Sequence, residues 1–242
     1  MSLNWYFLDR VACPGGLVGL REFEMVDLSH SSLDDFCRVL VKTGALKFGL
    51  FTLSGGKLSS YYLDMRILPS FPDAFRLAVD HLVAEAKKVK GMDKIAGIPT
   101  GGLPWASILA YNLSKPLVYT RKEVKTHGRE RRVEGVLASG DRVLLIDDVT
   151  TSGKNILEAY EILRAEGGVV EDALVLVDRE EGGRQRLEKK GLKLHTVTRM
   201  SEIAQKLLDM DAITKSQYGD IVGKETGEVS EDKPRDSGSD EE

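Results

Sequence analysis

Two adjacent aspartates, Asp147 and Asp148, end an apolar run in the segment VLLIDDVTTSGKN, residues 143–155. Two carboxylates repel an anion, but they accept hydrogen bonds from vicinal hydroxyls, as on a ribose, or steady a magnesium ion through water. The alternative is that one aspartate caps the next helix while its neighbour is solvated. Because a run of hydroxyl residues and glycine follows, the segment favours a binding site over this alternative.

The residues after the acid pair have the types that bind a phosphate. Residues 150–153, with the sequence TTSG, lead into a helix that is predicted to begin near Lys154. A helix N-terminus offers unpaired N–H groups and a partial positive charge, and the hydroxyls add donors. The spacing excludes a nucleotide-binding P-loop, because Asp148 stands where its first glycine is required.

Two further loops have residues suited to an anionic ligand. The segment PTGG, residues 99–102, places two glycines between a strand and a helix, which makes either a second backbone cradle for an anion or a simple tight turn. Residues 120–135 are polar and carry a net charge of +3. We interpret this long segment as a functional lid rather than a solvated surface. Its basic residues and its histidine are Arg121, Lys122, Lys125, His127, Arg129, Arg131 and Arg132.

The predicted elements place these loops at the ends of strands. Strands and helices alternate from residue 94 onward, and the runs VLLI and LVLV are continuously apolar, which indicates a parallel sheet covered on both faces. Ligands bind such sheets at the carboxyl ends of the strands. We expect strands at 94–98, 116–120, 173–178 and 192–198, a hairpin of 133–137 with 142–146, two short strands within 48–66 about Gly55 and Gly56, and helices at 31–44, 73–89, 103–113, 154–168, 184–191 and 201–213.

The bulk composition is that of a globular protein. The chain has 242 residues, of which 42% are hydrophobic and 30% are charged. We read no export signal and no apolar run that could cross a bilayer, so we expect a cytoplasmic protein without a membrane partner. Cys13 and Cys37 lack metal-site spacing, and Cys37 is expected in the core of a helix. Nucleic-acid binding is not expected, because no broad basic patch stands out.

Charge separates the end of the chain from its body. The net charge is −4, but residues 223–242 carry eight acids against three bases, which leaves the rest at about +1. With Val229 as its single aliphatic residue, this segment is predicted to be a disordered acidic tail. Residues 1–30 are an N-terminal extension of uncertain status, and 31–222 form the globular domain.

Three motifs together resemble the type I phosphoribosyltransferases: VLLIDDVTTSGKN, FGLFTLSGGKLSSYYLD and RKEVKTHG. The last two are similar to the branch that uses orotate, and the resemblance covers roughly residues 33–220. It implies an α/β fold with a mainly parallel sheet flanked by helices. Within it, a small N-terminal hood (about 31–70) would precede the core (about 71–222). The implied reaction transfers the 5-phosphoribosyl group of phosphoribosyl diphosphate (PRPP) to orotate, giving orotidine 5′-phosphate and pyrophosphate in pyrimidine biosynthesis.

The resemblance also assigns roles to residues. Asp147 and Asp148 would hold the ribose hydroxyls, and Arg179 would pair with the orotate carboxylate near Thr151, a fit that suits a planar guanidinium. Lys122, Lys125 and His127, with the acid pair, would form the catalytic set. The expected PRPP-binding residues are Thr100, Gly101, Gly102, Arg121, Lys122, Lys125, His127, Asp147, Asp148, Val149, Thr150, Thr151, Ser152, Gly153 and Lys154.

The sequence departs from the family pattern at two positions. Ser54 and Gly101 stand where many members have lysine, and Lys57 is a candidate substitute. The resemblance further implies a Mg²⁺ cofactor held mainly by PRPP, without direct side-chain ligands, and a homodimer with active sites shared between subunits. Two alternatives stay open: a phosphoribosyltransferase for another base, or a PRPP-sensing regulator without turnover.

Overall fold

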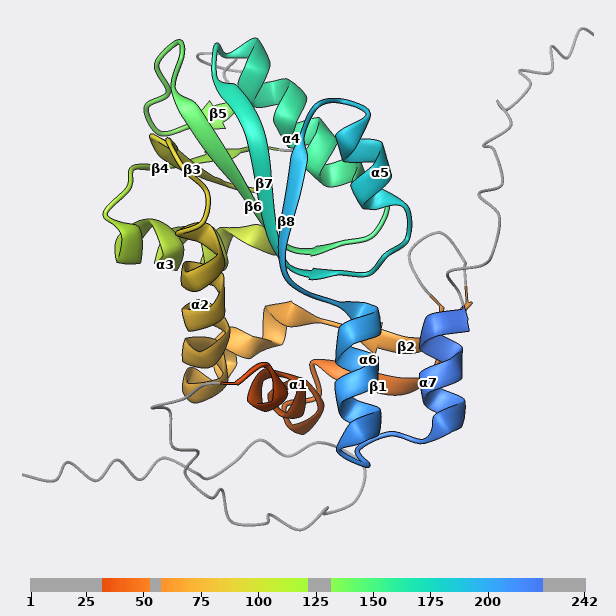
Figure 1. The fold of residues 1–242 in the computed structure, drawn as a ribbon. Coiled ribbons are helices and arrows are strands. Elements are labelled where there is room, and N and C mark those ends of the chain that lie inside the picture. The colour runs from red at the N-terminus through yellow and green to blue at the C-terminus, as the bar shows by residue number, and fades with distance from the viewer. Residues whose placement is uncertain (1–31, 53–57, 122–131, 224–242) are drawn as a thin grey trace, which may run out of the picture. The chain divides into compact units, whose positions relative to one another are not determined.

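A six-stranded sheet is the centre of the chain in a computed structural model, which describes residues 32–52, 58–121 and 132–223 (Figure 1). The strand order is β5-β4-β3-β6-β7-β8, and every neighbouring pair is parallel except β4 and β5. The strands are β3 (Lys94–Gly97), β4 (Leu117–Thr120), β5 (Val133–Glu134), β6 (Arg142–Thr150), β7 (Val169–Asp178) and β8 (Lys193–Arg199). The prediction of a mainly parallel sheet flanked by helices is confirmed.

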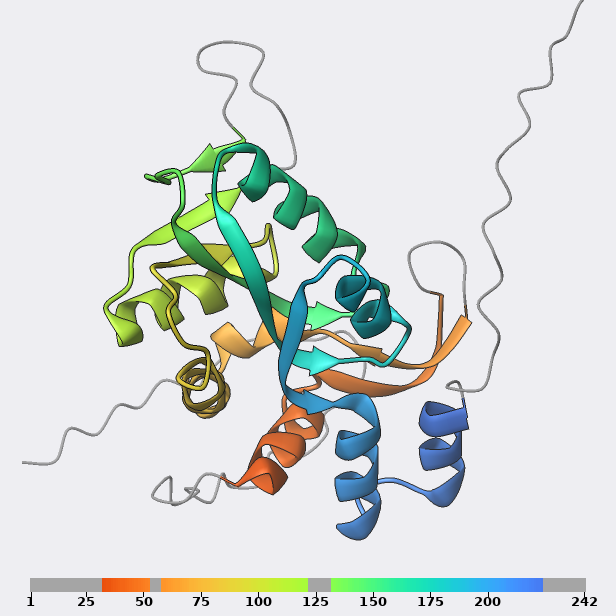
Figure 2. The same cartoon turned by 45° about the horizontal axis from the view of Figure 1, so that its top comes forward.

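Helices cover both faces of this sheet (Figures 1 and 2). Along β6, Leu144 and Ile146 pack in one apolar cluster with helices α2 (Pro72–Ala86) and α3 (Gly102–Leu113). Val143 and Leu145 pack in a second cluster with helices α4 (Lys154–Ala165) and α5 (Gly183–Glu188). Burial on both faces explains why this strand is continuously apolar.

A smaller layer lies below the large sheet in Figure 1. Strand β1 (Leu46–Thr52) pairs antiparallel with β2 (Leu58–Leu63), as predicted. Helix α1 (Leu33–Lys42) contacts β1 and α6 (Met200–Asp209), and helix α7 (Lys215–Val222) contacts β2 and α6. The 3₁₀ helix η2 (Met65–Ser70) follows β2. The division into hood and core stays a prediction, and the N-terminal extension and the acidic tail lie outside the described residues.

Helix α7 was not predicted, although a local signal for it exists. Thr214 and Gln217 form a capping box, in which the Thr214 hydroxyl accepts a hydrogen bond from the Gln217 backbone N–H at 3.2 Å. Only Ile221 of this helix is buried, so its apolar periodicity is too weak to be read from the sequence.

The predicted hairpin of residues 133–137 with 142–146 is wrong. Strand β5 pairs with β4, at Tyr119 with Glu134 and at Thr120 with Val133. Strand β6 lies between β3 and β7, so both of its edges are already hydrogen-bonded. The predicted turn before β6 does form, since the Asp141 backbone N–H donates to the carbonyl oxygen of Ala138. Strand β6, however, lies in the interior of the sheet, and β5 lies at its edge.

No helix in the described ranges is long and apolar enough to cross a bilayer. The core position predicted for Cys37 is confirmed: the side chain is fully buried in α1. Burial raises the pKa of the thiol to about 12, although the charge of Lys206 opposes this shift. The thiolate is therefore almost absent at neutral pH, and the residue acts as a small apolar side chain.

This burial predicts that Cys37 does not react in the folded protein. Native wild type and a Cys37→Ala variant are expected to release equal amounts of chromophore from Ellman's reagent at pH 8, because the shielded thiol contributes nothing. In denaturant, wild type should release one equivalent more than the variant. An excess from native wild type would show that the core around α1 opens readily.

Candidate active site

The acid pair and the PTGG loop meet at the carboxyl ends of two neighbouring strands, β6 and β3. The backbone N–H of Ile98 donates to the carbonyl oxygen of Ile146 at 3.1 Å, which carries the ladder to the start of the loop. A Cβ on Gly101 would lie 2.6 Å from Asp148 Oδ2, and one on Gly102 would lie 2.5 Å from the carbonyl oxygen of Ile146. Only glycine permits so close an approach. The structure thus brings two of the three predicted loops together.

The two aspartates differ in environment. Asp147 is buried, and its Oδ1 accepts a hydrogen bond from the Asp148 backbone N–H at 3.0 Å. Asp148 is partly buried, and its Oδ1 accepts from the Val149 N–H at 2.8 Å. Burial raises the pKa of Asp148, although hydrogen bonds and the charge of Arg66 oppose the shift. A desolvated carboxyl group of this kind gains most from ligand groups that donate hydrogen bonds.

The predicted phosphate loop joins β6 to α4. Gly153 has a φ of +74° and occupies the N-cap of α4, a conformation that glycine adopts without strain. The buried Thr150 hydroxyl has no hydrogen-bond partner within the described residues, so it is an available donor at this strand end. Gly183 packs against the loop, since a Cβ there would strike the carbonyl oxygen of Thr151. Lys154 is exposed at the start of the helix.

Arg179 lies directly after β7 and is only 9% exposed. Its Nε donates to the Tyr61 hydroxyl at 3.3 Å, and its guanidinium carbon lies 4.8 Å from the centre of the Tyr61 ring. Nη2 lies 2.8 Å from Glu181 Oε1, an ion-pair distance, but it makes no aligned hydrogen bond within the described residues. This nitrogen can therefore donate to a further acceptor.

Tyr61 and Glu181 contact Arg179 but were not among the residues predicted from the sequence. Burial raises the pKa of Tyr61, although the charge of Arg179 opposes this, so the phenol is neutral at physiological pH. The signal for Tyr61 was the alternation of β2, which buries Ser59, Tyr61 and Leu63 on one face. Glu181 gave no such signal, because it lies in a loop.

The described edge of the basic segment places Arg121 beside Glu134. Nη1 of Arg121 donates to Glu134 Oε1 at 2.5 Å, and its backbone N–H donates to the carbonyl oxygen of Arg132 at 2.9 Å. Arg121 is thus partnered by an acid of its own loop. Four predicted residues lie outside the described residues: Lys57, Lys122, Lys125 and His127.

The two histidines within the described residues, His81 and His195, each contact a neighbouring side chain. His195 Nε2 lies 2.7 Å from Asp172 Oδ1, and the His81 ring packs 5.7 Å from that of Phe36. Within the described ranges, no group of three or more His, Cys, Asp or Glu side chains is arranged to hold a metal ion. His30 lies outside these ranges.

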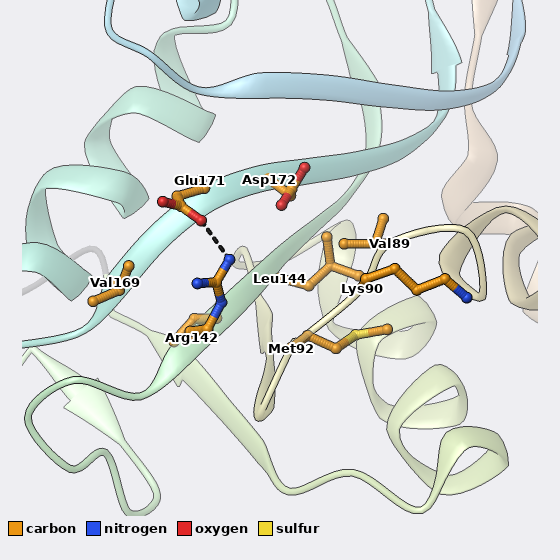
Figure 3. Close-up of a pocket in the computed structure, with 9 residues that line it drawn as sticks. Val89, Lys90, Met92, Arg142, Leu144, Val169, Glu171 and Asp172 are labelled. Carbon is orange, nitrogen blue, oxygen red and sulfur yellow. Dashed lines mark hydrogen bonds and ion pairs between the residues drawn. The ribbon is translucent and has the colours of Figure 1, made fainter.

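A hollow lies at the opposite, amino-terminal ends of β6 and β7 (Figure 3). Its lining includes Arg142 and Glu171, which form an ion pair of 2.6 Å, and the apolar side chains of Met92 and Leu144. Its volume of about 10 Å³ is at the lower limit for a single water. This hollow is therefore too small for a substrate.

Comparisons with known proteins show the family to which the chain is similar. The model of the phosphoribosyl transferase domain family matches residues 73–218. The chain is 46% identical to the orotate phosphoribosyltransferase of Cenarchaeum symbiosum over 178 residues, which are 72% of this chain and 89% of that protein. A crystal structure of orotate phosphoribosyltransferase from Aeropyrum pernix superposes with a TM-score of 0.66 at 40% identity, covering 74% of this chain and 99% of that one. The UMP synthase of Leishmania donovani superposes with a TM-score of 0.72 at 33% identity; 79% of this chain matches only 42% of that chain.

The glycine contacts predict a sharp contrast between two helical glycines. Gly102→Ala forces a methyl group onto the backbone of β6, so we expect a loss of about 1–3 kcal/mol in the free energy of unfolding. Gly219→Ala in α7 meets open space and should raise it by roughly 0.5–1 kcal/mol. Urea denaturation followed by circular dichroism measures both. Equal stabilities for the two variants would refute the close contact of the loop with β6.

Proposed function

The chain belongs to the orotate phosphoribosyltransferases, and from this premise we propose that it transfers the 5-phosphoribosyl group of PRPP to orotate. The products are orotidine 5′-phosphate and pyrophosphate, a step of pyrimidine biosynthesis. The observation that carries the proposal is the contact of Gly101 with Asp148 at adjoining strand ends. It supports a site in which an anion cradle and two hydroxyl-binding carboxylates share one ligand. PRPP joins a diphosphate to a dihydroxylated sugar, as such a site requires.

The described residues divide the substrate between them. Asp147 and Asp148 accept hydrogen bonds from the ribose hydroxyls and hold the ring in place. The loop 150–153 and the N-terminus of α4 bind the 5′-phosphate through backbone N–H groups and hydroxyls. The glycines of residues 99–102 bind the diphosphate through backbone N–H groups. Fixed at three points, the reacting carbon of the sugar is held in line for attack.

Magnesium suits this site as a companion of the diphosphate. Magnesium prefers oxygen ligands and keeps several waters, so PRPP would hold it mainly through the diphosphate; within the described residues, no group of three or more His, Cys, Asp or Glu side chains is arranged to hold an ion. Asp147 and Asp148 would hold the hydrated ion through its waters. When bound, magnesium would neutralise negative charge on the diphosphate.

Arg179 is proposed to select the base. Its position after β7 places it at the carboxyl edge of the sheet, and its Nη2 makes no aligned hydrogen bond within the described residues. A planar guanidinium matches the carboxylate of orotate, which purine bases lack. Tyr61 supports the guanidinium from one side, so the side chain is fixed before the base arrives.

The assembly proposed is a homodimer in which the segment containing Lys122, Lys125 and His127 completes the site of the partner subunit. Tyr111 on α3 is 82% exposed and Tyr119 on β4 is 38% exposed. Exposed aromatic side chains are enriched at protein interfaces, which supports association through the surface of α3 and β4. The cytoplasmic location remains part of the same proposal.

The experiment that tests the function is an absorbance assay of orotate consumption by the purified full chain. Loss of orotate is expected to require both PRPP and Mg²⁺. Adenine, guanine, hypoxanthine and uracil should be used far less well, because none offers Arg179 a carboxylate. Turnover of another base in preference to orotate, or PRPP binding without any turnover, would refute the assignment.

A second test of the proposed function is the double variant Asp147→Asn/Asp148→Asn. It keeps the shape of both side chains, so the fold should survive, but the amides lose the charge that attracts hydroxyl donors. We expect kcat/KM for PRPP to fall by orders of magnitude. Near-normal kcat/KM in a folded double variant would remove the acid pair from the site.

Arg179→Lys tests the base subsite on its own. The lysine keeps the charge but loses the planar fork, so orotate affinity should fall by about 1.5–3 kcal/mol, which is roughly tenfold to a hundredfold. PRPP affinity should change by less than about twofold. Titration calorimetry with each ligand separates these effects. An equal loss for both ligands would place Arg179 elsewhere in the site.

A further inference from the structure

Glu180 has a backbone conformation that is rare outside glycine. Three non-glycine residues in the described part of the chain have a positive φ: Ser114, Glu180 and Asp211. Ser114 is the C-cap of α3 and Asp211 comes directly after the C-cap of α6, where a left-handed residue commonly ends a helix. Glu180, with a φ of +58°, ends no helix and lies between β7 and α5. A strained residue in such a place persists only when its surroundings hold it.

Hydrogen bonds on both sides hold Glu180 in this conformation. Its backbone N–H donates to Asp178 Oδ1 at 2.9 Å, and its Oε2 accepts from the Ser201 backbone N–H, in the first turn of α6, at 2.9 Å. The Asp178 carboxylate is only 1% exposed, and Arg184 Nε donates to its Oδ2 at 3.2 Å. Arg184 Nη1 donates to the carbonyl oxygen of Leu194 in β8 at 2.7 Å. The loop after β7 is thus tied to α5, β8 and α6.

Arg179 lies between these fixed points. Its backbone N–H donates to the carbonyl oxygen of Thr150 at 2.9 Å, which attaches the main chain before Glu180 to the end of β6. Its Nη2 lies 2.8 Å from Oε1 of Glu181, the residue that directly follows the left-handed turn. An extended conformation at Glu180 would send the chain in another direction and carry Glu181 away from this ion pair. The setting of the guanidinium therefore depends on the backbone at Glu180.

We propose that Glu180 is a positioning residue for the base subsite. Its carboxylate, bound to the N-terminus of α6, holds the left-handed turn that places Glu181 against Arg179. A guanidinium fixed in this way presents Nη2 to the orotate carboxylate with little further loss of rotamer freedom. The hydrogen bonds of Glu180 lead to Asp178 and Ser201 and not to the loops proposed for PRPP, so its effect is specific to orotate. This inference rests on the proposed function and adds a residue to it.

The test compares KM for orotate and KM for PRPP in the full chain, each at a saturating concentration of the other substrate. Glu180→Ala removes the hydrogen bond to Ser201 and keeps the strained backbone. KM for orotate should rise about threefold to tenfold, the range for ordering one long side chain on binding. KM for PRPP should change by less than about twofold. Glu180→Gln keeps an acceptor oxygen at the same reach and should return KM for orotate to within about twofold of wild type.

Glu202→Ala is the matched control. Glu202 Oε2 accepts from the Arg199 backbone N–H and from the Thr198 hydroxyl, each at 3.0 Å, so its loss weakens the same end of α6 through bonds that do not lead to Arg179. Both KM values should stay within about twofold of wild type, and the melting temperatures of all three variants show whether they fold.

Four results would overturn this inference: an unchanged KM for orotate in Glu180→Ala, an equal rise for PRPP, no recovery in Glu180→Gln, or the same rise in Glu202→Ala. In each case, wild-type turnover of orotate would leave the proposed function intact. A wild type that consumes no orotate in the presence of PRPP and Mg²⁺ would overturn the proposed function and this inference together.

Discussion

The site depends on one steric constraint, the close approach of the two glycines that follow β3 to the backbone and acids near the end of β6. Neighbouring parallel strands deliver their outgoing loops to the same edge of the sheet, and the ladder continues through Ile98 and Ile146 up to the point of divergence. A side chain on either glycine would separate the loops. The absence of two side chains is therefore what brings the two loops close enough for one ligand to contact both in the proposed site.

The same close approach places two carboxyl groups beside the position proposed for an anionic ligand. Closely packed backbone desolvates Asp148 and raises its pKa, and a bound anion would add further negative charge to the same corner. Local hydrogen bonds to Asp147 and Asp148 stabilise the carboxylates but cannot balance a ligand. In the proposed site, balancing charge for a bound diphosphate would come from magnesium.

The sequence was sufficient for the parts of the fold that local physics decides. Alternating strands and helices, apolar β6 and β7, the acid pair and the glycine loop were all readable, because period and residue type determine them. The prediction of a hairpin at 133–146 was wrong because a strand can pair only along a free edge, and both edges of β6 are occupied by β3 and β7. Tyr61 was missed as a partner of Arg179 for a related reason: 118 residues separate them, and only the tertiary fold brings them together.

Strand β2 shows how one short element can position two arginines. Successive residues of a strand point to opposite faces, so Tyr61 and Tyr62 offer their hydroxyls on different sides. Tyr61 accepts from Arg179, which leaves β7, and Tyr62 accepts from Arg66, which follows β2 in η2. Each arginine is also paired with an acid, Glu181 or Asp64, so both guanidinium groups are oriented in the folded chain. Orienting Arg179 in this way would remove an entropic cost from the binding of orotate in the proposed site, since a long arginine side chain otherwise loses rotamer freedom when it closes on a ligand.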